Sequence, residues 1–181
     1  MKTILLTIVA GLLAACTSGT GKTDTLAGTD SATLPDSDTA QQERIGYQEQ
    51  HLSLEFKQAK LYNLSETLEE DFNGDGTPDH AQFLIEHDKA GVCITDGQTH
   101  EKIKIGLGTN FEEMGDNFSW VDYWGVVKDP TTYEVLIEDG EIVGDTIVHL
   151  QNPSIVVRAE EAGGGLITFR NGNYEWIHQA D

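Results

Sequence analysis

The stretch Asp71–Asp79 has the residue types and the spacing of a calcium-binding loop. Ca²⁺ takes roughly six to eight oxygen ligands, and a short loop supplies them by curling so that alternate residues point inward. The expected ligands are the side-chain oxygens of Asp71, Asn73 and Asp75, the backbone carbonyl of Thr77, and a direct or water-mediated oxygen of Asp79. Gly76 falls where the chain must turn most sharply, which suits a residue without a Cβ. The sequence therefore predicts a Ca²⁺ site at this loop.

The alternative for this loop is a surface turn without a metal, because Asp, Asn and Gly also favour turns for their own conformational reasons. Within the metal interpretation, a helix–loop–helix EF-hand is disfavoured. Gln82 stands at the twelfth position, where an EF-hand needs a bidentate Glu. Ala81, Phe83 and Ile85 then alternate with polar residues, which predicts a strand directly after the loop.

With the strand that follows it, the loop resembles the calcium loops of FG-GAP and VCBS-type repeats, as in integrin-like β-propeller blades. The similarity covers Leu61–Glu86 and occurs once. The glycines at 163–165 and the Asn171–Gly172 pair before Trp176 are also similar to the ends of secreted bacterial proteins that carry this loop. The resemblance implies a loop between two strands and an ion that is structural rather than catalytic. A closed propeller is not expected, since it needs at least about four blades of four strands.

The N-terminus is typical of a secretion signal. Lys2 precedes a short apolar run, Ile4–Leu13, which fits a signal peptide better than a membrane span. The ending Leu-Ala-Ala-Cys resembles a bacterial lipobox, in which Cys16 is lipidated after removal of residues 1–15. The alternative is an ordinary signal peptide with an incidental cysteine.

Residues 16–40 are predicted to form a flexible tether behind the lipidated cysteine. Thr, Ser, Gly and Asp dominate from Thr17 to Ala40, so the segment has too little apolar surface to repay its ordering entropy. An anchored domain on a tether would face the periplasm or the exterior. Thr17, rather than Asp, after Cys16 resembles lipoproteins sorted to an outer membrane.

Residues 41–181 are predicted to be a single all-β domain, calcium-binding through the loop above, with one short helix possible at Gln41–Gln50. From His51 onward, Leu52, Leu54 and Phe56 alternate with polar residues. Three sets of strands are then separated by turn signals: Asp96–Gly97, Asp139–Gly140, and the glycines at 163–165 followed by Asn171–Gly172. The expected architecture is an antiparallel, hairpin-rich sandwich or propeller-like partial sheets.

Trp120, Tyr123 and Trp124 form the densest aromatic group and are a possible binding surface. If exposed, they could stack on a glycan or contact a protein partner. Burial in the core is the favoured alternative for rings of this size.

The sequence offers no convincing catalytic set. Glu112, Glu113 and Asp116 could form a second ion site or a carboxylate pair for hydrolysis, although a solvated acidic loop is favoured. Cys93 lies in an apolar predicted strand and is expected to be a buried free thiol.

The net charge is −20, and removal of residues 1–15 would make it one unit more negative. Nucleic acid and anionic membrane surfaces would be repelled, so contact with a membrane is expected only through the lipid. The leading hypothesis is a lipid-anchored, non-catalytic binding or scaffold module of the cell envelope with a structural Ca²⁺ loop and a protein or glycan partner. The alternatives are a metal-assisted hydrolase and an inhibitor of a basic enzyme.

Overall fold

A computed structural model of the chain describes residues 37–160 and 163–179. The predicted signal peptide, Cys16 and most of the predicted tether lie outside these described residues. Within them, no helix is long and apolar enough to span a membrane.

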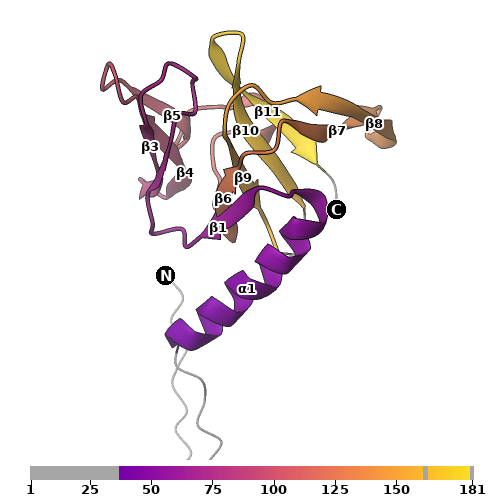
Figure 1. Cartoon of the computed structure of the whole chain (residues 1–181), viewed down its shortest axis with the longest axis horizontal. Coiled ribbons are helices and arrows are strands. Elements are labelled where there is room, and N and C mark those ends of the chain that lie inside the picture. The colour runs from indigo at the N-terminus through magenta and orange to yellow at the C-terminus, as the bar shows by residue number, and fades with distance from the viewer. Residues whose placement is uncertain (1–36, 161–162, 180–181) are drawn as a thin grey trace, which may run out of the picture. The chain divides into compact units, whose positions relative to one another are not determined.

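One helix precedes eleven strands in the described chain (Figure 1). The helix α1 spans Ser37–Glu55, and a 3₁₀ turn η1 spans Glu112–Met114. The strands are β1 (Ala59–Tyr62), β2 (Leu68–Glu70), β3 (Asp79–Glu86), β4 (Lys89–Thr95), β5 (Lys102–Gly106), β6 (Tyr123–Val127), β7 (Thr131–Glu138), β8 (Glu141–His149), β9 (Ser154–Arg158), β10 (Gly164–Arg170) and β11 (Asn173–Gln179).

The strands form two main sheets in which every pair of neighbours is antiparallel. One sheet has the order β1-β6-β9-β10-β11 and the other the order β2-β3-β4-β5. The hairpin β7-β8 forms a separate two-stranded sheet. The predicted all-β, hairpin-rich class is confirmed, and the strand predicted after the loop is β3.

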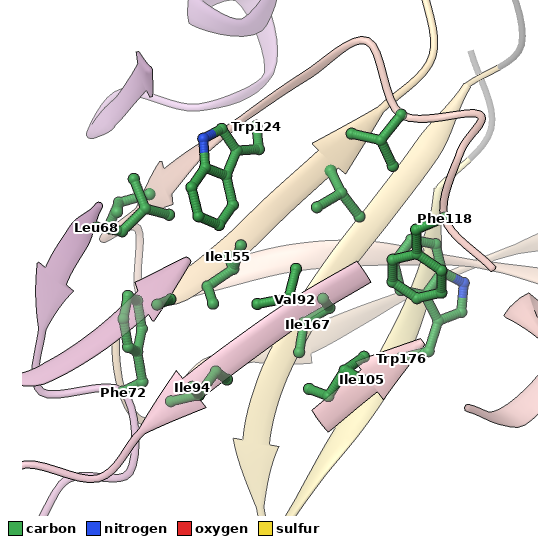
Figure 2. Close-up of a cluster of buried hydrophobic side chains, with 14 residues drawn as sticks. Leu68, Phe72, Val92, Ile94, Ile105, Phe118, Trp124, Ile155, Ile167 and Trp176 are labelled. Carbon is green, nitrogen blue, oxygen red and sulfur yellow. The ribbon is translucent and has the colours of Figure 1, made fainter. Parts of the chain in front are cut away.

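The main core lies between the two sheets (Figure 2). Val92, Ile94 and Ile105 reach it from the four-stranded sheet, and Trp124 and Ile155 reach it from the five-stranded sheet. Each of these side chains is at most 1% exposed. Burying a side chain of this size contributes about 1.5–3 kcal/mol, so face-to-face packing of the sheets is the main source of stability. The fold is a sandwich, one of the two architectures expected.

A second core covers the other face of the five-stranded sheet, and α1 contributes to it. Leu52 and Phe56 are each 3% exposed and pack with Val156 and Ile177, whereas Leu54 is 81% exposed. The alternation of Leu52, Leu54 and Phe56 therefore does not mark a strand. Leu52 and Phe56 are four residues apart, which places them on one side of a helical turn. The helix is also longer than the predicted segment Gln41–Gln50 and begins inside the predicted tether.

Two of the predicted hairpin turns have the expected backbone, and one does not. Asp139–Gly140 and Asn171–Gly172 all have positive φ angles, as tight two-residue hairpins require. Asp96–Gly97 instead begins a longer loop between β4 and β5, in which His100 has positive φ. This difference arises because the Gly97 amide donates to the Asp79 carboxylate at 2.9 Å and so belongs to a neighbouring loop.

A polar network, buried except at Glu55, attaches α1 to the five-stranded sheet. Arg158 on β9 is 3% exposed and donates to both carboxylate oxygens of Glu55, at 2.8 and 2.6 Å. It also donates to Gln179, which in turn donates to Thr132 on β7 at 2.6 Å. Burial lowers the pKa of Arg158, but hydrogen bonds and charge from Glu55 outweigh this effect and leave the pKa raised. Arg158 therefore stays charged, and the network connects four elements: α1, β7, β9 and β11.

Glu55→Ala is expected to lower the free energy of unfolding by about 3 kcal/mol, because it leaves the buried Arg158 charge without its carboxylate. Glu160→Ala is the matched control, since it removes an exposed carboxylate that pairs with Arg44, and it should cost less than about 1 kcal/mol. Denaturant unfolding of both variants measures the difference. Equal small losses would contradict a structural role for the Glu55–Arg158 pair.

Candidate metal centre

The predicted calcium loop connects β2 to β3 and is anchored at both ends. Glu70 pairs with Asp79 across the two strands, so the intervening residues must return within a tight curl. Phe72 is 1% exposed and packs into the main core. Gly74 and Gly76 have φ of 76° and 91°, and these positive values favour glycine. The loop is therefore shaped by a buried ring, two glycines and the strand register.

The carboxylate of Asp71 lies at the centre of the curl. Its Oδ1 accepts hydrogen bonds from the amides of Gly74 and Asp75, at 2.8 and 3.0 Å. Its Oδ2 accepts from the amide of Gly76, at 2.9 Å. Three successive amides thus point at one side chain, which is how an Asp at the first position can curl a loop around itself.

The oxygens of the first and third positions converge. The Asp75 amide donates both to Asp71 Oδ1 and to Asn73 Oδ1, the second at 2.9 Å, so these two oxygens lie close together. Asn73 Nδ2 lies 3.4 Å from Asp75 Oδ2, which brings the side chain of the fifth position to the same group. Asp75 Oδ1 accepts from the Thr77 amide at 2.8 Å. The side chains at positions one, three and five therefore lie next to one another.

Asp79 has a different place from its neighbours in the loop. It is fully buried, and its Oδ2 accepts from the amides of Phe72 and Asn73 at 3.0 and 3.3 Å. Its Oδ1 accepts from the amide of Gly97. Burial raises the pKa of Asp79, the three amide bonds lower it, and the charge of Asp96 adds to the rise. The structure thus gives Asp79 a backbone-bracing role in addition to any ligand role.

Asp96 and Gly97 join the site from the β4–β5 loop, and the sequence interpretation missed them. Asp96 Oδ2 accepts from Asn73 Nδ2 at 2.8 Å. A Cβ on Gly97 would lie 2.1 Å from the carbonyl oxygen of Pro78, so only glycine allows the two loops to meet. The prediction of a hairpin turn at Asp96–Gly97 gave no reason to expect a contact with the β2–β3 loop. The one signal in the sequence was Asp96 itself, a carboxylate directly after the apolar strand β4.

The loop also touches the five-stranded side of the sandwich. A Cβ on Gly74 would lie 2.4 Å from Oδ1 of Asn152, which precedes β9. Tyr174 on β11 is half-buried, and its phenol pKa is raised by burial and then by nearby carboxylates. In order of effect these are Asp79, Asp96, Asp71 and Asp75. The loop therefore lies where both sheets meet.

Three of the five predicted positions offer side-chain oxygens of the kind that a hard cation takes as ligands. The Oδ1 atoms of Asp71 and Asn73 lie close together, and Asp75 Oδ2 lies beside the Asn73 amide nitrogen; carboxylate and amide oxygens are of the type that Ca²⁺ prefers. Asp79 faces the amides beneath the loop, and Thr77 could contribute only its carbonyl. In the described part of the chain, no three His, Cys, Asp or Glu side chains are grouped closely enough to hold a metal ion by themselves. An ion here would need the Asn73 amide and backbone oxygen as well as the carboxylates.

The aromatic group does not form a shared surface. Trp124 is fully buried, and its Nε1 donates to the carbonyl of Asn63 at 2.9 Å, so the binding-surface assignment is wrong for this residue. Trp120 is half-buried against the main core, with its ring 5.7 Å from that of Phe118. Tyr123 packs against the second core instead, because neighbouring strand residues point to opposite faces. Core packing, the favoured alternative, explains most of this aromatic group.

The acidic residues at 112–116 are engaged separately. Glu112 accepts from the backbone amide of Trp176 at 3.0 Å and so covers the edge of β11. Asp116 pairs with Lys89 at 2.9 Å. Glu113 is exposed on η1. The group is thus a set of local contacts, while Cys93 is a buried free thiol as predicted.

Comparisons with models of known protein families, with curated proteins and with solved structures found no match for this chain.

Asp75→Asn is expected to abolish most of the stabilisation by Ca²⁺, because it removes one charge from the converging oxygens but keeps an acceptor for the Thr77 amide. Asp71→Ala should abolish it as well, with a further loss in the absence of calcium because three amides lose their acceptor. Thr77→Ala should keep the calcium effect, since only its carbonyl is an expected ligand. Thermal unfolding of each variant with and without Ca²⁺ provides the measurement. Equal calcium-induced shifts in wild type and Asp75→Asn would refute the ligand assignment.

Proposed function

We propose that the chain is a lipid-anchored module of the cell envelope, with a non-catalytic binding or scaffold role and a structural Ca²⁺ ion in the β2–β3 loop. The observation that carries the proposal is the convergence of Asp71, Asn73 and Asp75 at a loop that contacts both sheets. Such an ion would be held by these three side chains, the Thr77 carbonyl and, through a direct or water-mediated oxygen, Asp79. Its contribution is electrostatic, as it neutralises carboxylates that the fold brings together.

The charge balance around the loop supports a cation. Asp71, Asp75, Asp79 and Asp96 all raise the pKa of Tyr174, so their negative potentials overlap at one phenol. Among the ion pairs formed by described residues, none includes any of these four carboxylates. A bound divalent ion would offset their mutual repulsion and stabilise the folded chain by RT ln(1 + [L]/Kd), about 2.7 kcal/mol at a hundredfold excess over Kd.

A binding role is favoured over hydrolysis because the candidate catalytic acids, Glu112 and Asp116, make separate structural contacts. Glu112 is held by a backbone amide and Asp116 by a lysine, and they act in different contacts. A pair of carboxylates that serve as acid and base must instead face one substrate bond. The metal loop itself is closed by amides of its own backbone, which suits a structural ion.

Thermal unfolding of the full chain in EDTA, in excess Ca²⁺ and in excess Mg²⁺ tests the metal part of the proposal. Calcium should raise Tm by several degrees, since about 1 kcal/mol corresponds to roughly 2–4 °C in a chain of this size. Magnesium should raise it less, because Mg²⁺ demands tighter octahedral geometry and releases its water reluctantly. No difference between EDTA and calcium would leave the loop as a metal-free turn.

Cys16→Ser tests the anchor. The variant should move from the membrane fraction to the soluble fraction, because a thiol is needed for lipidation and a hydroxyl does not replace it. Cell fractionation followed by detection of the chain gives the result. Wild type and Cys16→Ser both remaining with the membrane would refute the lipobox assignment.

A further inference from the structure

The hairpin β7–β8 carries most of the exposed large hydrophobic side chains of the described chain. Among the described residues, seven large hydrophobic side chains are exposed, and five of these seven belong to this hairpin. They are Leu136, Ile137, Ile142, Val143 and Ile147, which are 42–72% exposed. Contiguous exposed apolar side chains on a folded protein mark an interaction site more often than scattered ones do.

The strand register sorts these side chains by face. Tyr133 lies opposite Ile147, and Ile137 lies opposite Ile142, with Val135 between them on the same face of β7. Asp145 lies opposite Val135 and so adds one acid to this otherwise apolar face. At a bulge between Leu136 and Ile137, Val143 has no register partner. Ile142 therefore faces Ile137 and lies on the same side of the hairpin as Ile147. We call this face the apolar stripe: Tyr133, Val135, Ile137, Ile142 and Ile147.

The opposite face of the hairpin is acidic. Glu134 and Glu138 lie on this face of β7 with the exposed Leu136 between them, and Glu141 lies directly opposite Glu138. Like charges at facing positions of an antiparallel pair are destabilising. Residues 131–149 contain no Lys or Arg, and the described residues form no ion pair with these three acids. The acidic face thus lacks a positive partner within the described chain.

The base of the hairpin is fixed, and its edge is open. Val148 is 7% exposed in the second core, and Thr132 accepts from Gln179 at the start of β7. The two strands nevertheless pair only with each other in the described structure (labelled β7 and β8 in Figure 1). On β7, the Tyr133 carbonyl accepts from Gln179 of β11, whereas residues 141–147 of β8 are all exposed. The outer edge of β8 can therefore accept a further strand.

We propose that the β7–β8 hairpin is a docking surface for an extended, basic protein segment in which Lys or Arg alternates with apolar residues. Added at the edge of the hairpin, such a segment would place its apolar side chains along the apolar stripe and its cations beside Glu134, Glu138 and Glu141. A second copy of this chain would bring the same acids together, and an anionic lipid surface would also be repelled. The inference rests on the proposed binding role and gives it a partner chemistry.

Fluorescence anisotropy with a labelled peptide of alternating Lys and Leu tests the proposal on the full chain. Ile142→Asn with Ile147→Asn should weaken binding at least about tenfold, because both side chains lie in the apolar stripe. Leu54→Asn with Ile85→Asn is the matched control, since these side chains are 81% and 76% exposed on other elements. The control should bind as wild type does. Equal weakening in both double variants, or no binding to wild type, would overturn the docking surface.

Charge and periodicity are tested by two further peptides and two further variants. A peptide with Glu in place of Lys, and a Lys–Leu peptide of the same composition in a helical pattern, should each bind at least about tenfold more weakly. Glu138→Gln with Glu141→Gln should reduce the salt dependence of binding, whereas the exposed acids Glu49→Gln with Glu113→Gln should not. Equal affinity for the Glu peptide or for the helical pattern overturns the proposed partner chemistry.

Sedimentation of wild type and of the Ile142→Asn, Ile147→Asn variant separates a second copy from a basic partner. We expect a monomer in both, whereas a dimer that the substitutions dissociate would assign the apolar stripe to self-association and overturn the proposal. The Ca²⁺-induced shift in Tm is measured on the same samples. If Ca²⁺ still raises Tm but the peptide does not bind, only the docking surface is refuted. If the peptide binds but Ca²⁺ does not raise Tm, only the Ca²⁺ site is refuted.

Discussion

The buried carboxylate of Asp79 is the interaction on which the junction of the β2–β3 and β4–β5 loops depends. It is the first residue of β3, it is fully buried, and it accepts from three amides on two loops. A buried carboxylate is costly unless its oxygens are hydrogen-bonded, so the chain around it is constrained to deliver those amides. Two come from the loop after β2 and the third from Gly97 after β4. The shape of the predicted metal loop thus depends on a residue beneath it, and an ion above would act on a backbone that is already closed.

Much of the fold could be predicted because it depends on local chemistry. Two-residue hairpin turns require positive φ, which Asp-Gly and Asn-Gly pairs adopt readily. Asp139–Gly140 and Asn171–Gly172 have these angles, so both hairpins could be predicted from the residues alone. The loop of Asp71, Asn73 and Asp75 was equally local, since each contact that gathers these side chains spans only two to four residues. Large aromatic rings such as Trp124 were better assigned to the core than to a surface.

The rest required contacts between distant parts of the chain. Leu52, Leu54 and Phe56 fit both a strand and a helical turn, and only packing against Val156 and Ile177 decides for the helix. Asp96–Gly97 resembled a tight turn because its partner, Asp79, lies on another strand. The apolar stripe also could not be seen in advance. A bulge changes which residues face one another, and an exposed strand face has the same alternation as a buried one.

Hydrogen exchange of the amides in residues 71–79 and 96–99, with Ca²⁺ and with EDTA, tests the central claim most directly. The amides of Phe72, Asn73 and Gly97 share one carboxylate, so an ion held by the first loop should stabilise the second loop as well. We expect calcium to slow exchange in both segments together, while exchange of the amides in the β7–β8 hairpin changes little. Unchanged exchange in both segments, or slowing at 71–79 without any at 96–99, would contradict a calcium-braced junction built on Asp79.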